Sequence, residues 1–193
     1  MPRTKQFDKQ EVLEKAMELF WEKGFHATSI QDLVTSLGIN RASLYDTFGG
    51  KEALFESAFQ LYRQISTKHI QQIFESEPNV KQGFKVLFEK AIEESTNDIC
   101  KKGCFVVNTT TELIPGDDKI QKILLENKNN AETLFADYVQ KGIGTGQIDS
   151  TKEAREIGSM LFTLFNGIRV LAKVDTNPNK LKKVVNLGLS VLD

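Results

Sequence analysis

The stretch GFHATSIQDLVTSLGINRASLYDTFGGKEALF, residues 24–55, decides the fold class of this 193-residue chain. It contains two short runs with apolar residues at helical spacing, separated by Gly38 and closed by the pair Gly49-Gly50. The second run has room for barely two helical turns. Its polar residues surround a narrow apolar edge, so the burial of apolar surface does not by itself account for so short a helix.

Capping residues mark the helix ends in this stretch. Thr28 and Ser29 are N-cap candidates for the first run, and Asp32 follows Ser29 by three positions, the spacing of a capping box. Asn40 is suited to cap the second run, residues 41–48. Two short helices joined by a tight turn with glycine are typical of a helix-turn-helix, whose second helix enters the major groove of DNA.

The sequence on either side is also helical in pattern. Apolar residues recur every three or four positions from Asp8 to Lys23 and through most of the chain after residue 51, and no segment alternates as a strand does. We therefore predict an all-α protein. Residues 1–50 form a three-helix domain with the helix-turn-helix, and residues 51–193 form a larger helical bundle domain.

Local signals predict the ends of three helices in the second domain. A helix is predicted from Ile120 to Val139, with a glycine-rich loop over residues 142–147. Ser150 and Glu153 have capping-box spacing and predict the start of a helix that runs to about residue 174. The pair Asn177-Pro178 predicts the start of the last helix.

Composition indicates a globular protein of the cytoplasm. Hydrophobic residues make up 40% and charged residues 26% of the chain, which is ordinary for a folded domain. The uncharged run at residues 157–168 is too short to span a bilayer, so no membrane contact is expected. The first residues lack the apolar run of a secretion signal, and two cysteines are no disulfide framework.

The second helix of the motif has two distinct sides. At about 100° per residue, Leu44 and Phe48 fall on one edge, which suits them for anchoring the helix. The opposite side carries Ala42, Ser43 and Asp46, with Tyr45 and Thr47 on the flanks. Small and polar residues let a helix axis approach the bases, so this side is predicted to face the major groove.

Individual roles on DNA follow from side-chain chemistry. Arg41, at the N-terminal end, is suited to a bidentate contact with guanine. The hydroxyls of Tyr45 and Thr47 are predicted to meet phosphates, and Lys51 with the free amides of the next helix forms an anion site. We assign the same phosphate-binding role to Thr28 and Ser29 at the start of the preceding helix.

Net charge does not favour DNA binding. It is −1 for the chain, and residues 1–51 contain seven basic and seven acidic residues, so no overall field attracts nucleic acid. A helical protein-interaction module or ligand carrier that does not bind an operator therefore remains the alternative hypothesis.

The quoted stretch resembles the N-terminal domain of the TetR family of bacterial transcriptional regulators. The resemblance covers about residues 9–55 and rests on the Gly-Phe helix end, Thr-Ser-Ile, the Gly-Ile turn, Leu-Tyr-x-x-Phe and Lys-Glu-x-Leu. It implies a homodimer with two DNA-binding heads and a C-terminal domain that encloses a ligand pocket. Thr47 departs from the family pattern, in which many members carry histidine, and Asp46 beside it would favour cytosine or repel a phosphate.

Dimerisation through the last two helices agrees with their residues. The helix after Ala154 is apolar over much of its girth, and the last helix is similar, so the two are suited to form half of a four-helix bundle. The plainer alternative is that both pack inside a monomer. Two-fold symmetry matches a palindromic operator of double-stranded DNA.

The resemblance places an effector pocket in the second domain. The predicted lining residues are aromatic or lie near the Cys-Lys-Lys-Gly-Cys segment: Phe84, Phe88, Cys104, Phe105, Asn108, Phe135, Phe162 and Phe165. The polar row at residues 108–112 would supply hydrogen bonds to a ligand or, equally well, form an exposed helix start. The alternative for the phenylalanines is an ordinary core.

Cys104 has a second interpretation as a redox sensor. Nearby lysines favour a thiolate, and some TetR-family members with a similar Gly-Cys respond to electrophiles or oxidants. That resemblance implies Cys104 as the modified thiol, Cys100 as its resolving partner and Lys173 as a cationic neighbour. The competing interpretation is a small buried hydrophobic residue.

Catalysis is not predicted. Neither histidine follows a glutamate by three positions as di-iron sites require, and no zinc spacing, phosphate-binding loop or nucleophile elbow occurs. We therefore expect no catalytic residue, metal or cofactor. The predicted function is a ligand-responsive, sequence-specific DNA-binding regulator, a repressor released from a palindromic operator by a small molecule or an electrophile.

Overall fold

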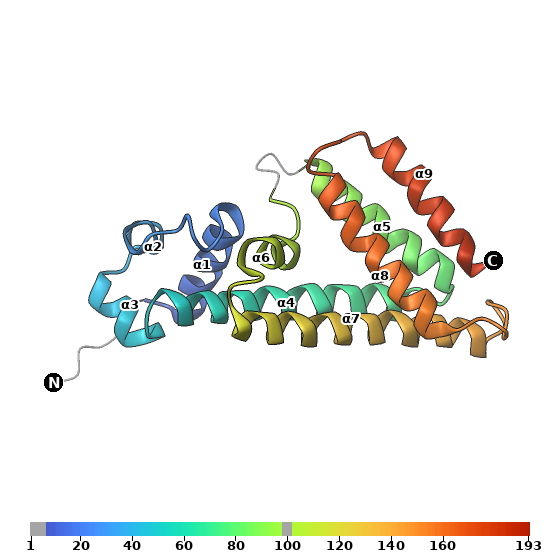
Figure 1. Ribbon diagram of the computed structural model, residues 1–193, viewed down its shortest axis with the longest axis horizontal. Coiled ribbons are helices and arrows are strands. Elements are labelled where there is room, and N and C mark those ends of the chain that lie inside the picture. The colour runs from blue at the N-terminus through green and yellow to red at the C-terminus, as the bar shows by residue number, and fades with distance from the viewer. Residues whose placement is uncertain (1–6, 98–101) are drawn as a thin grey trace. The chain divides into compact units, whose positions relative to one another are not determined.

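The computed structural model describes residues 7–97 and 102–193 (Figure 1). The regular structure within these residues is helical and includes no strand, which confirms the predicted all-α class. The first helices are α1 (Lys9–Lys23), α2 (Ile30–Leu37), α3 (Arg41–Phe48) and α4 (Lys51–Ser76). They are followed by α5 (Val80–Asn97), α6 (Phe105–Leu113), α7 (Asp118–Gly144), α8 (Ala154–Leu171) and α9 (Pro178–Leu189), with a short 3-10 turn at Ser190–Leu192.

The chain divides into two compact units, Met1–Ile65 and Ser66–Asp193, and the division falls inside α4. The predicted boundary after residue 50 lies instead at the start of that helix. The first part of α4 groups with the N-terminal unit because Phe55 packs there. Its ring meets the rings of Phe20 and Phe25 edge-on, with centroids 5.2 Å and 5.0 Å away.

The N-terminal unit has a core to which each of its short helices contributes. Phe20 of α1, Leu33 of α2 and Leu44 of α3 are fully buried. Helix α1 begins where the Asp8 carboxylate accepts the N–H of Gln10 at 2.8 Å and ends at Gly24, as the sequence predicts. These contacts set the positions of α2 and α3, which form the helix-turn-helix.

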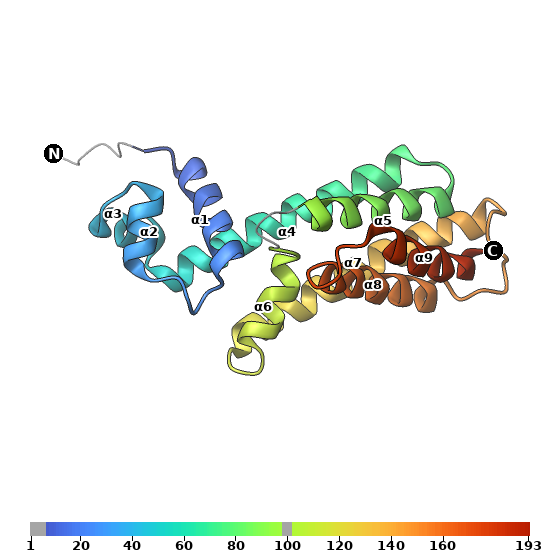
Figure 2. The ribbon, with the colours of Figure 1, turned by 90° about the horizontal axis from the view of Figure 1, so that it is seen from above.

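The C-terminal unit is a bundle in which α8 packs against α5, α7 and α9 (Figures 1 and 2). Helices α7 and α8 approach very closely at Gly158, where a Cβ would stand 2.7 Å from the backbone nitrogen of Ala136. An aromatic cluster of Phe74, Phe84 and Tyr138 fills the end of this unit. The Tyr138 hydroxyl donates to the Glu77 carbonyl at 2.7 Å, and burial, together with the charge of Glu77, raises the pKa of Tyr138 to about 12.

The ends of α7 and α8 differ from the sequence prediction, and α8 ends at Leu171 instead of about residue 174. Helix α7 continues past residue 139 to Gly144. Gly142 lies inside it, and Ile148 comes within 2.7 Å of where a Cβ of residue 142 would stand. Helix α8 begins at Ala154 without a side-chain cap, so the predicted capping box of Ser150 is wrong. The last helix begins at Pro178 with Asn177 as its N-cap, as predicted.

Among the described residues, no helix is both long enough and apolar enough to cross a membrane.

Candidate nucleic-acid interface

The turn between α2 and α3 has the geometry that a helix-turn-helix requires. Gly38 ends α2 in the left-handed conformation with φ 66°, where a side chain would be strained. Ile39 is buried and fixes the turn to the core. The Asn40 side chain then accepts the N–H of Ser43 at 2.8 Å and starts α3, as predicted.

Helix α3 has the two sides that the sequence predicts. Leu44 is fully buried and Phe48 partly buried, so this edge holds the helix on the unit. Ala42 and Asp46 are exposed on the other side, and Ser43 and Thr47 are half-buried. The outward side is therefore polar, narrow and free to approach a groove.

Arg41 and Tyr45 form a pair at the edge of this outward side. The guanidinium carbon of Arg41 lies 5.8 Å from the centre of the Tyr45 ring, one helical turn away. Such a cation–π contact limits the orientations of an exposed arginine. Tyr45 is itself 44% exposed, which leaves its hydroxyl accessible.

The end of α3 brings two lysines to its C-terminal side. Gly49 closes the helix with φ 87°, and its N–H donates to the Tyr45 carbonyl at 2.9 Å. The Lys51 ammonium lies 4.3 Å from the centre of the Phe25 ring, and the Lys9 ammonium lies 5.7 Å from that of Phe48. Lys9 was missed by sequence reasoning because nothing in local spacing signals its position beside residue 48.

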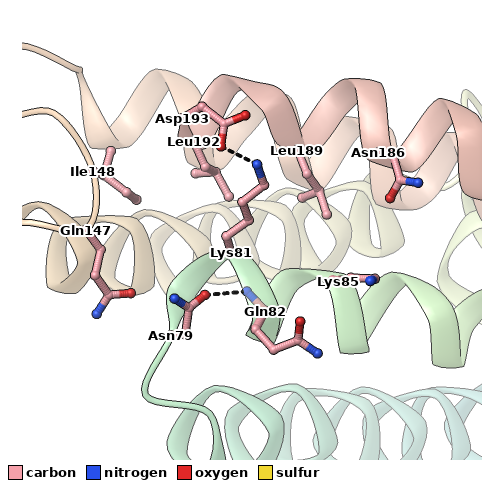
Figure 3. Close-up of a pocket in the computed structure, with 10 residues that line it drawn as sticks. All are labelled: Asn79, Lys81, Gln82, Lys85, Gln147, Ile148, Asn186, Leu189, Leu192 and Asp193. Carbon is pink, nitrogen blue, oxygen red and sulfur yellow. Dashed lines mark hydrogen bonds and ion pairs between the residues drawn. The ribbon is translucent and has the colours of Figure 1, made fainter.

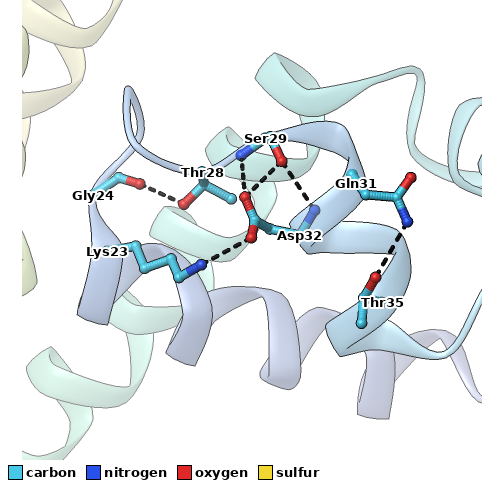
Figure 4. A network of polar contacts seen from close by, with 7 residues as sticks. All are labelled: Lys23, Gly24, Thr28, Ser29, Gln31, Asp32 and Thr35. Atoms are coloured by element: carbon cyan, nitrogen blue, oxygen red, sulfur yellow. Dashed lines mark hydrogen bonds and ion pairs between the residues drawn. The ribbon is translucent and has the colours of Figure 1, made fainter.

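The start of α2 is occupied by a carboxylate of the same helix (Figure 4). The Ser29 hydroxyl and N–H both donate to Asp32, at 2.5 Å and 2.9 Å, and the Asp32 N–H donates back to the Ser29 hydroxyl at 3.0 Å. Lys23 donates to the other carboxylate oxygen at 2.9 Å. These hydrogen bonds, first from the Ser29 hydroxyl and then from Lys23, hold the pKa of Asp32 well below its usual range.

This network changes the roles expected of Thr28 and Ser29. Thr28 is buried and its hydroxyl donates to the Gly24 carbonyl at 2.6 Å, so its side chain has a structural role instead of facing a phosphate (Figure 4). Ser29 is exposed, but its hydroxyl and N–H already donate to Asp32. A phosphate would therefore compete with a carboxylate for the donors of Ser29.

Comparison with known proteins follows the same division of the chain. Residues 12–58 match the family described as bacterial regulatory proteins, tetR family, and residues 83–187 match the tetracyclin repressor-like C-terminal domain. The uncharacterized HTH-type transcriptional regulator YezE of Bacillus subtilis (strain 168) is 32% identical over 197 residues, with 100% of both chains covered. This chain belongs to the TetR family.

Other TetR-type relatives include a repressor and solved DNA complexes. The HTH-type transcriptional repressor ComR of Escherichia coli (strain K12) is 28% identical over 97% of this chain and 90% of its own. Two structures of cysteine mutants of the TetR family regulator CifR, complexed with 26 bp operator DNA, have TM-scores of 0.88 and 0.89 at 25% and 26% identity. Each covers 99% of this chain and 100% of the CifR chain. The protein is thus a helix-turn-helix transcriptional regulator, a class without enzymatic activity.

The predicted effector phenylalanines of this TetR-family chain, except Phe105, belong to the bundle core or pack against it. Phe84, Phe88, Phe105 and Phe135 are fully buried, Phe165 is nearly so and Phe162 is partly buried. Phe135 has neighbouring ring centroids at 5.4 Å (Phe84), 5.7 Å (Phe162) and 6.0 Å (Phe165). Rings packed in this way already fill the space that an effector would need, so a role in binding stays a prediction.

A cavity of about 460 Å³ lies elsewhere in the C-terminal unit (Figure 3). It is lined mainly by polar residues from the start of α5, the end of α9 and the loop after α7, including Asn79, Lys85 and Asn186. Lys81 and Asp193 form an ion pair there. None of the predicted effector residues lines this cavity.

The segment around Cys104 is described from Lys102 onward, and Cys100 lies outside the described residues. Cys104 is a buried free cysteine at the N-cap position of α6. The stem of Lys173 packs over Gly103, where a Cβ would stand 2.6 Å from Lys173 Cδ, and its ammonium donates to Asn108 at 3.1 Å. The structure thus brings Lys173 to this segment, as expected.

A metal site has no support in the described part of the chain. No group of three or more histidine, cysteine, aspartate or glutamate residues there is placed to hold an ion.

Proposed function

We propose that the protein is a homodimeric repressor that binds a palindromic operator and is released from it by an effector. The observation that carries this proposal is the outward side of α3, which is polar, exposed and fixed at both ends by Asn40 and Gly49. A helix so anchored is suited to enter a major groove by its N-terminal end. The operator complexes of CifR, at 25% and 26% identity, support the same use of the fold.

The proposed contacts divide into base and phosphate contacts. Arg41 is assigned to a guanine, and the small residues Ala42 and Ser43 allow close approach. Tyr45 and Thr47 donate to the phosphates on either side of the groove, together with the lysines at residues 9 and 51. Thr28 and Ser29 are left out because their donors are used inside the unit.

An apolar stripe on the last two helices supports the homodimer. On α8 it runs at helical spacing through Met160, Leu164, Gly167, Leu171 and Val174 just beyond the helix end, and on α9 it includes Val184 and Leu187. Leu187 is 76% exposed and Leu171 54%. Exposed apolar residues arranged in a continuous stripe are typical of an interface, and a second copy would bury them as a four-helix bundle.

A small-molecule effector is proposed to bind beside α6. Thr109 is buried, and its hydroxyl has no hydrogen-bond partner among the described residues. A buried hydroxyl without a partner is unfavourable, so a polar group of an effector at this position would gain affinity. The second proposal is that an electrophile modifies the Cys104 thiol, with Lys173, whose side chain packs over the preceding Gly103, as its cationic neighbour.

Operator binding is tested with the full chain and labelled duplexes from the DNA upstream of its own gene. Fluorescence anisotropy between 50 and 200 mM salt should show an inverted-repeat fragment bound about a thousandfold or more tighter than a scrambled duplex, with affinity falling steeply as salt rises. Failure to bind any fragment at low salt would instead support the carrier or interaction module.

Repression and release are tested with a reporter downstream of the bound fragment. Expression should fall when the protein is supplied and recover with an effector found by screening. Normal recovery of a Cys104→Ser variant with every inducing compound would exclude the thiol as the sensor. Loss of recovery with electrophiles alone would support it.

A further inference from the structure

We propose that Asp46 determines operator specificity by accepting a hydrogen bond from the amino group of a cytosine in each half-site. The inference rests on the proposed function, because it assigns a base to one position of the same α3 surface. It concerns the single acidic residue on that helix.

Asp46 lies on the side of α3 that points away from the N-terminal unit. At 100° per residue it stands about 180° from the midpoint of Leu44 and Phe48, the edge that anchors the helix. Asp46 is exposed, and its small neighbour Ala42, one turn away, is exposed too. Because Ala42 is small, it would not prevent the Asp46 carboxylate from reaching the base edges in a major groove.

Helix stability does not explain an aspartate at this position. Asp46 lies in the last turn of α3, where a negative charge is unfavourable with the helix dipole. No described residue makes a hydrogen bond or an ion pair with its carboxylate. Asp32, on the neighbouring helix, is the contrast, since its carboxylate accepts bonds from Ser29 and Lys23.

Base chemistry restricts what such a carboxylate can meet. Guanine presents two acceptors in the major groove, and thymine presents one acceptor and a methyl group. Neither base offers a donor to a carboxylate, so a carboxylate there would be repelled or left without a hydrogen bond. Adenine offers a donor with an acceptor beside it. Cytosine offers only its amino donor, which makes it the favoured partner of an aspartate.

Arg41 and Asp46 together then specify G·C pairs at two positions of each half-site. Arg41 takes a guanine and Asp46 takes a cytosine within the same half-site. The repulsion between Asp46 and a wrong base adds discrimination that Arg41 alone does not provide.

The test compares base preferences of the full chain and its variants on a half-site first defined by selection with the unaltered protein. Dissociation constants are measured for all four base pairs at each position with the unaltered protein, Asp46→Ala and Asp46→Asn. We expect one symmetric position to prefer cytosine by about 5- to 100-fold, and Asp46→Ala to abolish that preference alone. Asp46→Asn should shift it toward adenine, whose N6 and N7 suit an amide.

Two controls isolate the carboxylate contact. Glu22→Ala removes an exposed acid from α1 and should leave every base preference unchanged. Methylating the preferred cytosine at N4 should weaken binding of the unaltered protein and leave Asp46→Ala unaffected.

The outcomes are separable. If Asp46→Ala tightens binding to all duplexes equally and changes no preference, Asp46 only repels phosphates and the inference is wrong. If the unaltered protein selects no sequence at all, the proposed function itself fails, and this inference with it.

Discussion

At the scale of single residues, Arg41 is the residue proposed to contact a base, and substituting it distinguishes a base contact from a phosphate contact. Its guanidinium is held over Tyr45 at the start of α3, where only a bidentate contact with guanine gives it specificity. Arg41→Ala should therefore cost about 1–3 kcal/mol on the operator and much less on a random duplex. The matched variant is Lys51→Ala, whose loss should be similar on both duplexes, with a shallower salt dependence. Equal losses for Arg41→Ala on both duplexes would make it a phosphate contact.

Asp32 gives the N-terminal unit a predictable pH dependence. The pKa of Asp32 is lower in the folded protein than the value of about 3.9 in an unfolded chain. The ionised carboxylate therefore contributes its full stabilisation above that value. The stabilisation is lost as pH falls below about 4, when the unfolded state takes up the proton first. The free energies of unfolding of the unaltered protein and Asp32→Asn, measured with urea, should thus differ most at pH 5–7, and the difference should shrink steadily as pH falls below 4. A difference that is constant across this range would contradict the assignment.

Contacts between residues of different helices could not be predicted from the sequence. Spacing on α3 correctly indicated that Leu44 is buried and that Ala42 and Asp46 are exposed, because one helix fixes those relations. The placement of Lys9 beside Phe48 and of Lys51 over Phe25 depends on how separate helices pack. Burial of Thr28 was missed for the same reason, since its hydroxyl bonds to the turn before α2.

At the scale of elements, capping-box spacing predicted one helix start correctly and another wrongly. Ser29 and Asp32 form the predicted capping box, with both reciprocal bonds present. Ser150 and Glu153 have equal spacing, but Asp149 accepts both the N–H and the hydroxyl of Thr151 and forms a turn there. Because that turn satisfies the backbone first, α8 starts only after Glu153. A capping box is thus predictable only where no neighbouring side chain competes.

The close contact between α7 and α8 leaves no room for a side chain at residue 158. A methyl group at residue 158 would meet the backbone of Ala136, which has no rotamer to yield. Gly158→Ala should lower the free energy of unfolding by about 1–3 kcal/mol. Gly144→Ala is the control, because nothing lies within 4 Å of its Cβ position and alanine favours a helix. Equal stability of the two variants in urea would show that α7 and α8 are not packed so closely.

At the scale of the whole molecule, the proposed dimer would link two DNA-binding heads. Leu187→Glu places a charge in the exposed apolar stripe of α9 and should convert a dimer to a monomer in sedimentation. Affinity for a full inverted repeat should then fall by about 100-fold or more, because two linked half-sites no longer bind together. Lys182→Glu, exposed on another side of α9, should leave the dimer intact. A monomeric unaltered protein would contradict the proposed interface.

Selection from a randomised duplex library with the full chain tests the central claim most directly. Successive rounds of binding and amplification should enrich an inverted repeat whose half-site centres are one or more helical turns of about 10 bp apart. Such a repeat would establish that two α3 helices contact successive major grooves in a symmetric dimer. The contradicting result is a library that stays random after selection at low salt, because a helical carrier or interaction module has no preferred DNA sequence.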